Sequence, residues 1–296
     1  SWLQQQFQYY NVQSLDIVQM PRRPELDDVV LKTFMPTNSN QLPLVARLWQ
    51  LTSTRYVIGL KPFVDTLVPQ LDPTAQRFSV RAAFNFVPRT TNRPAESLSL
   101  EEITTTIQPD GQFALFEFTG ALPRAHLFAR WQISTNDSET LERLGDPAFD
   151  PTQSVLVAGP HPAPAPDTST NATAGTVAIT SYHPKQVALK AEVTKPAVLL
   201  LNDRYDPDWK VWVDGKPETI LRCNYIMRGV SLTPGNHTVE FRFQPRVTPL
   251  YVSLAALFLG LALCCLLVFA RRWSTAGPAF PETAVSETNA ASPKPA

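Results

Sequence analysis

Residues 250–270 read LYVSLAALFLGLALCCLLVFA, a run of 21 residues without one charged side chain. A helix needs about 20 predominantly apolar residues to cross the roughly 30 Å of hydrocarbon in a bilayer. A buried helix of a soluble protein of this length would show a polar stripe, and none is present. The run therefore predicts one transmembrane helix over residues 249–272, with the lipid bilayer as a partner of the chain.

The flanks of this run indicate its orientation. Arg271 and Arg272 follow it directly, and Trp273 suits the membrane interface. Lysine and arginine are enriched on the cytoplasmic side of transmembrane helices, so this end is expected to face the cytoplasm. Two further arginines, at positions 242 and 246, precede the run and make the charge bias alone a near tie.

The orientation places residues 1–248 outside the cytoplasm and the tail 273–296 inside it. The tail contains mostly small and polar residues with several prolines. Such a composition cannot bury enough apolar area to offset the entropy lost on ordering. The sequence therefore predicts a disordered cytoplasmic tail.

Composition limits the class of the remaining chain. The 296 residues allow about two domains besides the membrane segment. Lys plus Arg equals Asp plus Glu at 26 each, so the chain lacks the basic surplus of nucleic-acid-binding proteins. The 28 prolines against 11 glycines favour extended segments and turns over a helical bundle.

Cysteine usage excludes a disulfide within the soluble part. Cys264 and Cys265 lie inside the apolar run, which leaves Cys223 alone in a strand-like segment, where a small buried side chain is the expected role. The sequence begins at Ser1 without a basic region followed by an apolar one, so we expect no secretory signal in it and delivery to the membrane by a segment upstream.

Residues 151–248 carry the pattern of an antiparallel β-sandwich. Apolar residues alternate with polar ones over 187–193 and 239–243, which is typical of half-buried strands. Residues 197–201 (AVLLL) are continuously apolar, as in a strand covered on both faces. Asp214-Gly215 follows the alternating segment 209–214 and predicts a tight hairpin turn. The proline-rich segment from Gly159 predicts a linker or a long surface loop.

Residues 1–150 contain segments with the apolar periodicity of helices and others with that of strands, which predicts an α+β module. Helices are expected over Glu25–Met35, Leu42–Leu51 and Asp137–Leu144, and strands over Phe78–Phe86, Phe113–Phe118 and Ala125–Trp131. The predicted fold class is mainly β with some α: an N-terminal mixed α+β module, a membrane-proximal antiparallel β-sandwich and one C-terminal transmembrane helix.

Three segments near the C-terminal end follow one another: the hairpin WKVWVDGK at 209–216, the pair Asn224-Tyr225 and the strand PGNHTVEF at 234–241. In these segments and their order the chain resembles the YfhO-like family of bacterial membrane proteins. Weaker likenesses upstream are SYHP at 181–184, ALPRA at 121–125 and NVQSLDI at 11–17, so the resemblance extends over most of residues 1–270. One departure is Asp208, where the family usually has glycine.

The resemblance implies a location in the bacterial cytoplasmic membrane and a link to cell-envelope glycosylation. Members of the family look like membrane glycosyltransferases that take a sugar from a polyprenyl-phosphate carrier, with catalytic groups in a multi-helix membrane part. This chain resembles the region after that part. The resemblance thus implies a non-catalytic extracytoplasmic accessory region, whose partners would be a multi-helix membrane module and a lipid-linked or envelope glycan. The alternative is a single-span, membrane-anchored binding or structural module without an enzymatic role.

Two groups of residues are candidates for a binding site. Asp203, Asp206, Asp208 and Asp214 crowd around one turn, where oxygen ligands could hold Ca²⁺, although aspartates also occupy turns for their own backbone hydrogen bonds. The turn interpretation is favoured, so no metal site is assigned. Trp212, Tyr205 and Tyr225 are candidate glycan contacts, with packing against the first module as the alternative role of Trp212.

No catalytic constellation is visible in the sequence. The four histidines are far apart and lack the spacing of zinc ligands. Neither a glycine-rich phosphate loop nor a nucleophile-elbow motif is present. We therefore expect no catalytic residues and no cofactor in this chain.

Overall fold

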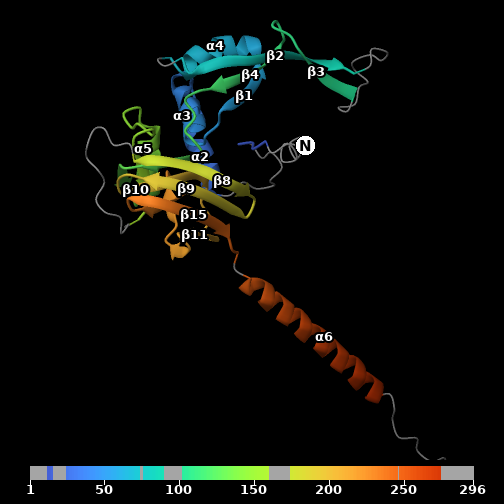
Figure 1. Ribbon diagram of the computed structural model, residues 1–296. Helices are drawn as coiled ribbons and strands as arrows, with labels where there is room; N and C mark the ends of the chain where they lie inside the picture. The colour runs from blue at the N-terminus through green and yellow to red at the C-terminus, as the bar shows by residue number, and fades with distance from the viewer. Residues whose placement is uncertain are drawn as a thin grey trace, which may run out of the picture. The chain divides into compact units, whose positions relative to one another are not determined.

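The computed structural model describes residues 12–15, 25–73, 76–89, 102–159, 174–245 and 247–274. The chain divides into two compact units, Ser1–Gln244 and Pro245–Ala296 (Figure 1). Most of the predicted disordered tail, at 275–296, and most of the predicted proline-rich linker, at 160–173, lie outside the described residues.

Six strands of the first unit form one sheet, here called the central sheet, in the order β5-β10-β14-β13-β7-β6. They are β5 (Ala125–Phe128), β6 (Trp131–Ile133), β7 (Val155–Val157), β10 (Ala197–Arg204), β13 (Leu221–Cys223) and β14 (Met227–Leu232). β6 and β7 pair in parallel, and the other described neighbours pair antiparallel. Residues 197–203 of β10 are all buried, which confirms the strand predicted to be covered on both faces.

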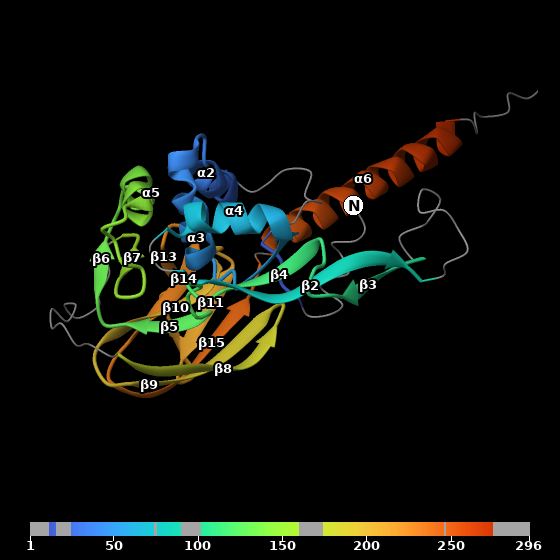
Figure 2. The ribbon, with the colours of Figure 1, turned by 90° about the horizontal axis from the view of Figure 1, so that it is seen from above.

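The central sheet is rolled. Only residues 129 and 130 separate β5 from β6, although these strands stand at opposite ends of the strand order. The edges of a flat six-stranded sheet would lie about 24 Å apart, whereas the chain from Phe128 to Trp131 spans at most about 11 Å. The sheet must therefore curl, and Figure 2 shows β5 turning sharply into β6. The single strand predicted over 125–131 is thus wrong, because residues 125–128 pair with β10 whereas Trp131 begins a second strand that pairs with β7.

Five strands form a second, antiparallel sheet, here called the outer sheet, in the order β12-β11-β15-β9-β8. They are β8 (Gly175–His183), β9 (Gln186–Val193), β11 (Trp209–Val213), β12 (Lys216–Glu218) and β15 (Gly235–Phe243). The predicted Asp214-Gly215 hairpin joins β11 to β12. Both turn residues have positive φ, 52° and 77°, as this turn requires.

The two faces of β10 enter different cores. Ala197, Leu199 and Leu201 belong to the core between the central and outer sheets, together with Leu189 of β9 and Phe241 of β15. The side chains between them, at 198 and 200, belong to a core on the opposite face. The predicted β-sandwich is confirmed as the packing of the central sheet on the outer sheet, and it also includes β5 and β6, which precede residue 150.

Three helices cover that opposite face. They are α2 (Glu25–Phe34), α3 (Pro43–Leu51) and α5 (Asp137–Gly145), with the short 3-10 helix η2 (Ser39–Gln41) before α3. All three helices were expected from the sequence, and α5 begins at Asn136, whose side chain accepts a hydrogen bond from the Ser138 amide. In Figure 2 these helices lie on one side of the strands.

A small antiparallel sheet has the order β1-β4-β2-β3. Its strands are β1 (Tyr56–Leu60), β2 (Phe78–Pro88), β3 (Ile103–Ile107) and β4 (Phe113–Phe118). Helix α4 (Lys61–Leu71) lies along one face of it (Figure 1). This helix is not among those predicted, and it contains Pro69, a residue that normally argues against a helix interior.

Strands from both halves of the chain share the central sheet. β5 and β6 precede residue 150, whereas β7, β10, β13 and β14 follow it. The central sheet therefore spans the position at which the sequence predicts a boundary between two modules. The overall prediction of a mainly β fold with some helices and one long C-terminal apolar helix is confirmed.

The second unit contains helix α6 (Thr248–Ser274). Residues 250–271 of this helix are long and apolar enough to cross a bilayer, and none of that window is buried inside the protein. Among the described residues it is the one candidate membrane span. Residues 244–247 alone separate it from the end of β15.

Candidate functional site

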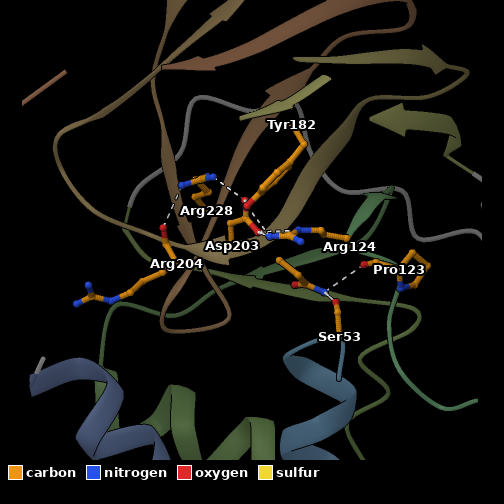
Figure 3. Close-up of polar contacts among 8 residues, drawn as sticks. Ser53, Pro123, Arg124, Tyr182, Asp203, Arg204 and Arg228 are labelled. Carbon is orange, nitrogen blue, oxygen red and sulfur yellow. Dashed lines mark hydrogen bonds and ion pairs between the residues drawn. The ribbon is translucent and has the colours of Figure 1, made fainter. Parts of the chain in front are cut away.

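The most buried ionic cluster of the described residues centres on Asp203. This residue lies near the end of β10, where the pairing with β14 shifts register between Leu201 and Arg204. Its side chain is 7% exposed. Arg124 donates to Oδ1 from Nε at 2.9 Å and from Nη2 at 2.5 Å, and Arg228 donates to Oδ2 from Nη2 at 2.7 Å (Figure 3). Both carboxylate oxygens are therefore occupied by guanidinium groups.

Tyr182 brings the outer sheet into this cluster. It comes from β8, and its hydroxyl donates to Asp203 Oδ2 at 3.1 Å and accepts from Arg124 Nη2 at 2.5 Å. The Arg124 guanidinium also lies 4.2 Å from the centre of the tyrosine ring. Burial, and then the negative charge of Asp203, raise the pKa of Tyr182. The cluster thus ties the central sheet to the outer one at this end of the sandwich.

Arg228 is a buried cation that needs its partners. Its side chain is 3% exposed, and its guanidinium lies 3.8 Å from the centre of the Trp209 ring. Burial lowers the pKa of Arg228, and the charge of Asp203 opposes that shift. Nη1 donates to the carbonyl of Arg204 at 3.3 Å, while Nε has no hydrogen-bond partner. One carboxylate and one aromatic face together compensate this desolvated charge.

Asn202 connects the same strand to the loop after α3. Its Nδ2 donates to Ser53 Oγ at 2.8 Å and to the Pro123 carbonyl at 3.2 Å. Ser53 has a positive φ of 56°, so this bond helps to hold a strained turn. Figure 3 shows Ser53 and Pro123 beside Arg124. Two adjacent residues of β10 thus make different connections: Asn202 binds the turn after α3, and Asp203 binds Tyr182 of the outer sheet.

The chemistry available at this cluster is limited. A carboxylate that accepts from two arginines and a tyrosine is a poor general base, and no serine, cysteine or lysine side chain contacts it among the described contacts. The arrangement instead has the properties of a structural ion cluster. Sequence reasoning named Asp203 but not its partners. The signal was available, since Arg124 lies in ALPRA and Tyr182 in SYHP, segments already noted for their family resemblance.

The other aspartates of the candidate acidic cluster have separate roles. Asp206 accepts a hydrogen bond from the Asp208 amide at 2.8 Å, which closes a turn before β11. Asp214 lies in the hairpin turn, where it accepts from the Thr238 amide at 2.8 Å and lies 2.7 Å from His237 Nδ1. These bonds lower the pKa of Asp214, the Thr238 amide contributing most. Among the described residues no group of three or more acidic, histidine or cysteine side chains could hold a metal ion.

Trp212 lies on the solvent-facing side of the outer sheet. Along β11 it alternates with Trp209, Val211 and Val213, which face the sandwich core, so the prediction that it points away from Trp209 agrees with the strand geometry. It is half-buried, opposite Glu240 on β15 and Pro217 on β12. The Arg242 guanidinium lies 4.9 Å from the centre of its ring.

The structure places one of the two tyrosine candidates, Tyr225, away from Trp212. Tyr225 is 5% exposed and belongs to the core under the helices, on the far side of the central sheet. Tyr205 is half-buried directly after β10, and its amide donates to the Ile226 carbonyl at 2.6 Å. Asn224 and Tyr225 both adopt positive φ, 42° and 72°, which gives this family-like pair a role in a turn.

The remaining candidates for chemistry are the buried Cys223 and the half-buried His126, which lie apart from each other in the sequence. Burial raises the pKa of the Cys223 thiol and thereby keeps it protonated. Burial lowers the pKa of His126, which packs against Phe128 at 4.6 Å between ring centres. Neither group has a second reactive side chain among its described contacts.

Comparison with known proteins gives one match. The model of a family described as "Bacterial membrane protein YfhO" matches residues 167–255. This range contains Tyr182, Asp203, Arg228 and Trp212 together with the start of α6, and it leaves out Arg124. No curated protein and no solved structure matches the chain.

Proposed function

We propose, from the match of residues 167–255 to the model of the YfhO family of bacterial membrane proteins, that the chain is a non-catalytic extracytoplasmic accessory region. In this proposal it serves cell-envelope glycosylation. A multi-helix membrane module outside residues 1–296 transfers sugar from a polyprenyl-phosphate carrier, and this region positions the acceptor glycan or the lipid-linked sugar near that module.

The observation that carries the proposal is the short connection between a folded β unit and a membrane span. β15 ends at Phe243 and α6 begins at Thr248. A connection this short ties the folded β unit to a helix that can span the bilayer, and lipid-linked sugars are held in that bilayer. The pair Arg271-Arg272 after the apolar run supports an orientation with residues 1–248 outside the cytoplasm.

Trp212 is the glycan contact that this proposal favours. Its indole ring is partly accessible on the outer sheet, and Arg242, Glu240 and Gln186 provide hydrogen-bonding groups around it. A flat aromatic surface edged by charged donors and acceptors suits a sugar, which presents both C–H faces and hydroxyl groups. Tyr205 remains a second candidate, and Tyr225 would need its core packing to open first.

The orientation can be tested with single cysteines in the full chain. The background carries Cys264→Ala and Cys265→Ala, and Lys216→Cys in the exposed hairpin is compared with Ser292→Cys in the tail. A membrane-impermeant maleimide should label position 216 in intact spheroplasts and position 292 only after permeabilisation. The reverse pattern would overturn the proposed orientation.

The accessory role predicts a stable association with the multi-helix module. When the full chain is extracted in mild detergent from its own bacterium, a polytopic glycosyltransferase-like protein should co-purify with it. Recovery of the chain alone, after cross-linking in intact cells as well, would favour the single-span binding or structural module instead.

Glycan contact is tested by binding of isolated cell-wall glycans to the full chain in nanodiscs. Trp212→Ala should weaken binding about tenfold, which corresponds to about 1.4 kcal/mol. Lys210→Ala is the matched control, since it lies on the same strand and the same face. Equal binding by both variants and the unaltered chain would exclude Trp212 as the contact.

A further inference from the structure

Among the described residues, no helix or strand packs against one face of the small sheet. Residues paired across the strands place Tyr56, Ile58, Phe84, Phe86, Ile107 and Phe113 on the same side, here called the open face. Tyr56, Ile58, Phe86 and Ile107 are 52%, 63%, 53% and 77% exposed. On the opposite face Ala114 and Phe116 are 0% and 2% exposed. The middle strand β4 is thus buried on that side, whereas the open face presents apolar side chains to solvent.

The open face is continuous rather than scattered. Phe84, Phe86 and Phe113 form an aromatic cluster in its middle, with ring centres 4.8–5.9 Å apart. Ile107 lies opposite Phe84 on the edge strand β3, and Ile58 continues the patch on the other edge strand, β1. Proteins that stay free in water seldom expose a continuous apolar surface of this kind, so it indicates a binding surface.

A small cluster of charge lies on the same face. Glu117 of β4 is 2% exposed and lies opposite Tyr56. Arg55 donates to its Oε1 from Nε at 2.8 Å, and Arg81 pairs with its Oε2. These contacts, with the hydrogen bond from Arg55 first, lower the pKa of the Glu117 carboxyl group. Two guanidinium groups against one carboxylate leave a net positive charge, and the arginine side chains remain 63% and 57% exposed.

We propose that the open face binds the surface of the bilayer that α6 spans, with its apolar side chains at the boundary between headgroups and acyl chains. Tyrosine and arginine are residues that suit this boundary, because each combines an apolar body with a polar end. The net positive charge complements anionic phospholipid headgroups. The membrane span in the same chain keeps lipid at high effective concentration, so a weak contact suffices.

A second copy of the chain is the less favourable occupant. A symmetric dimer through the open face would bring the same patch of both copies together. Arg55 and Arg81 of one copy would then approach those of the other, with the positive charge compensated by only one carboxylate in each. The bilayer lacks this repulsion. The inference goes beyond the proposed glycan contact, because it concerns a different sheet and does not depend on Trp212.

Quenching experiments on the full chain test the proposal. The Cys264→Ala, Cys265→Ala background carries Ile58→Cys on the open face or, as a matched control, Lys190→Cys on the exposed side of the outer sheet. Each cysteine is labelled with a fluorophore in vesicles containing phosphatidylglycerol. Nitroxide-labelled lipids should reduce the fluorescence at position 58 and leave that at position 190 unchanged.

Two other outcomes would overturn the proposal. Quenching at position 58 by a water-soluble quencher, without quenching by lipid nitroxides, would show an open face in water. Protection from both quenchers would show that protein covers the face.

A charged residue introduced on the open face tests the lipid contact independently. Ile107→Asp should abolish lipid quenching at position 58, whereas Thr106→Asp, on the opposite face of β3, should not. Because Ile107 is exposed, its substitution leaves the packed core intact, and circular dichroism verifies that the fold is retained. Equal lipid quenching in both variants would contradict the proposed contact.

Discussion

In the central sheet every residue of β10 from Ala197 to Asp203 is buried, whereas in the small sheet Ile58 and Ile107 are 63% and 77% exposed. Both sheets contain many β-branched and other apolar residues. The central sheet has helices on one side and the outer sheet on the other, while the small sheet is covered on one side by α4. Apolar side chains therefore stabilise the core in the central sheet, whereas in the small sheet they form the proposed binding surface.

The ion pairs of the two regions also differ in how far they are buried. In the sandwich, Asp203 is enclosed by Arg124 and Arg228, whose charges it compensates inside the protein. In the small sheet, Glu117 is buried but its partners Arg55 and Arg81 reach into solvent. A buried ion cluster must be complete to be tolerated, whereas a surface cluster can leave charge available for a ligand.

The largest expected effect comes from opening the ion cluster of the sandwich. Asp203→Ala leaves the buried Arg228 guanidinium without its carboxylate and should lower the free energy of unfolding by about 3–5 kcal/mol. Urea unfolding of the full chain in detergent micelles, followed by tryptophan fluorescence, measures it. Glu218→Gln on the exposed strand β12 is the control and should change stability by less than about 0.5 kcal/mol. Similar losses in both variants would contradict the structural role of the cluster.

The comparison of sheets is sharpened by truncating one side chain in each. Leu200 of β10 is 1% exposed, and Leu200→Ala should cost about 2–5 kcal/mol because it removes buried methyl groups and leaves a cavity. Ile58→Ala on the open face should stay within about 0.5 kcal/mol. The same unfolding assay checks both. A large loss for Ile58→Ala would mean that the open face is part of a core.

The smallest effect concerns pH and the β11–β12 hairpin. The pKa of Asp214 is lower in the folded chain, mainly through the Thr238 amide and then His237, so the folded state binds fewer protons than the unfolded one. This stabilisation is present above the unfolded pKa of about 3.9 and is lost as the pH falls through the lower folded value. Asp214→Asn should therefore flatten the acid side of the stability profile slightly.

Thermal unfolding of the full chain between neutral and acidic pH measures this difference. The variant keeps part of the pH dependence, because the carboxyl groups of Glu117 and Glu240 also have lowered pKa values. Asparagine tolerates the positive φ that this turn position requires, so the Asp214→Asn variant retains the fold. Identical profiles for both proteins would show that Asp214 does not contribute to acid sensitivity.

The sequence by itself determined the elements whose signals are local. A charge-free run over 250–270 requires lipid or a dry core around it, continuous apolarity over 197–201 requires cover on both faces, and Asp214-Gly215 favours a hairpin. Each follows from side-chain polarity or backbone freedom within a few residues. Helix α4 was not predicted, because Pro69 in its interior normally argues against a helix.

Tertiary structure alone decided which distant residues meet. Arg124 and Asp203 are 79 positions apart, and no periodicity links them until β5 and β10 pair. The same holds for the strand predicted over 125–131, where β5 and β6 pair with different strands. It also holds for the open face, because its exposure depends on how distant parts of the chain pack. Local patterns fix the faces of a strand, but long-range pairing fixes what those faces touch, because contact depends on the whole fold.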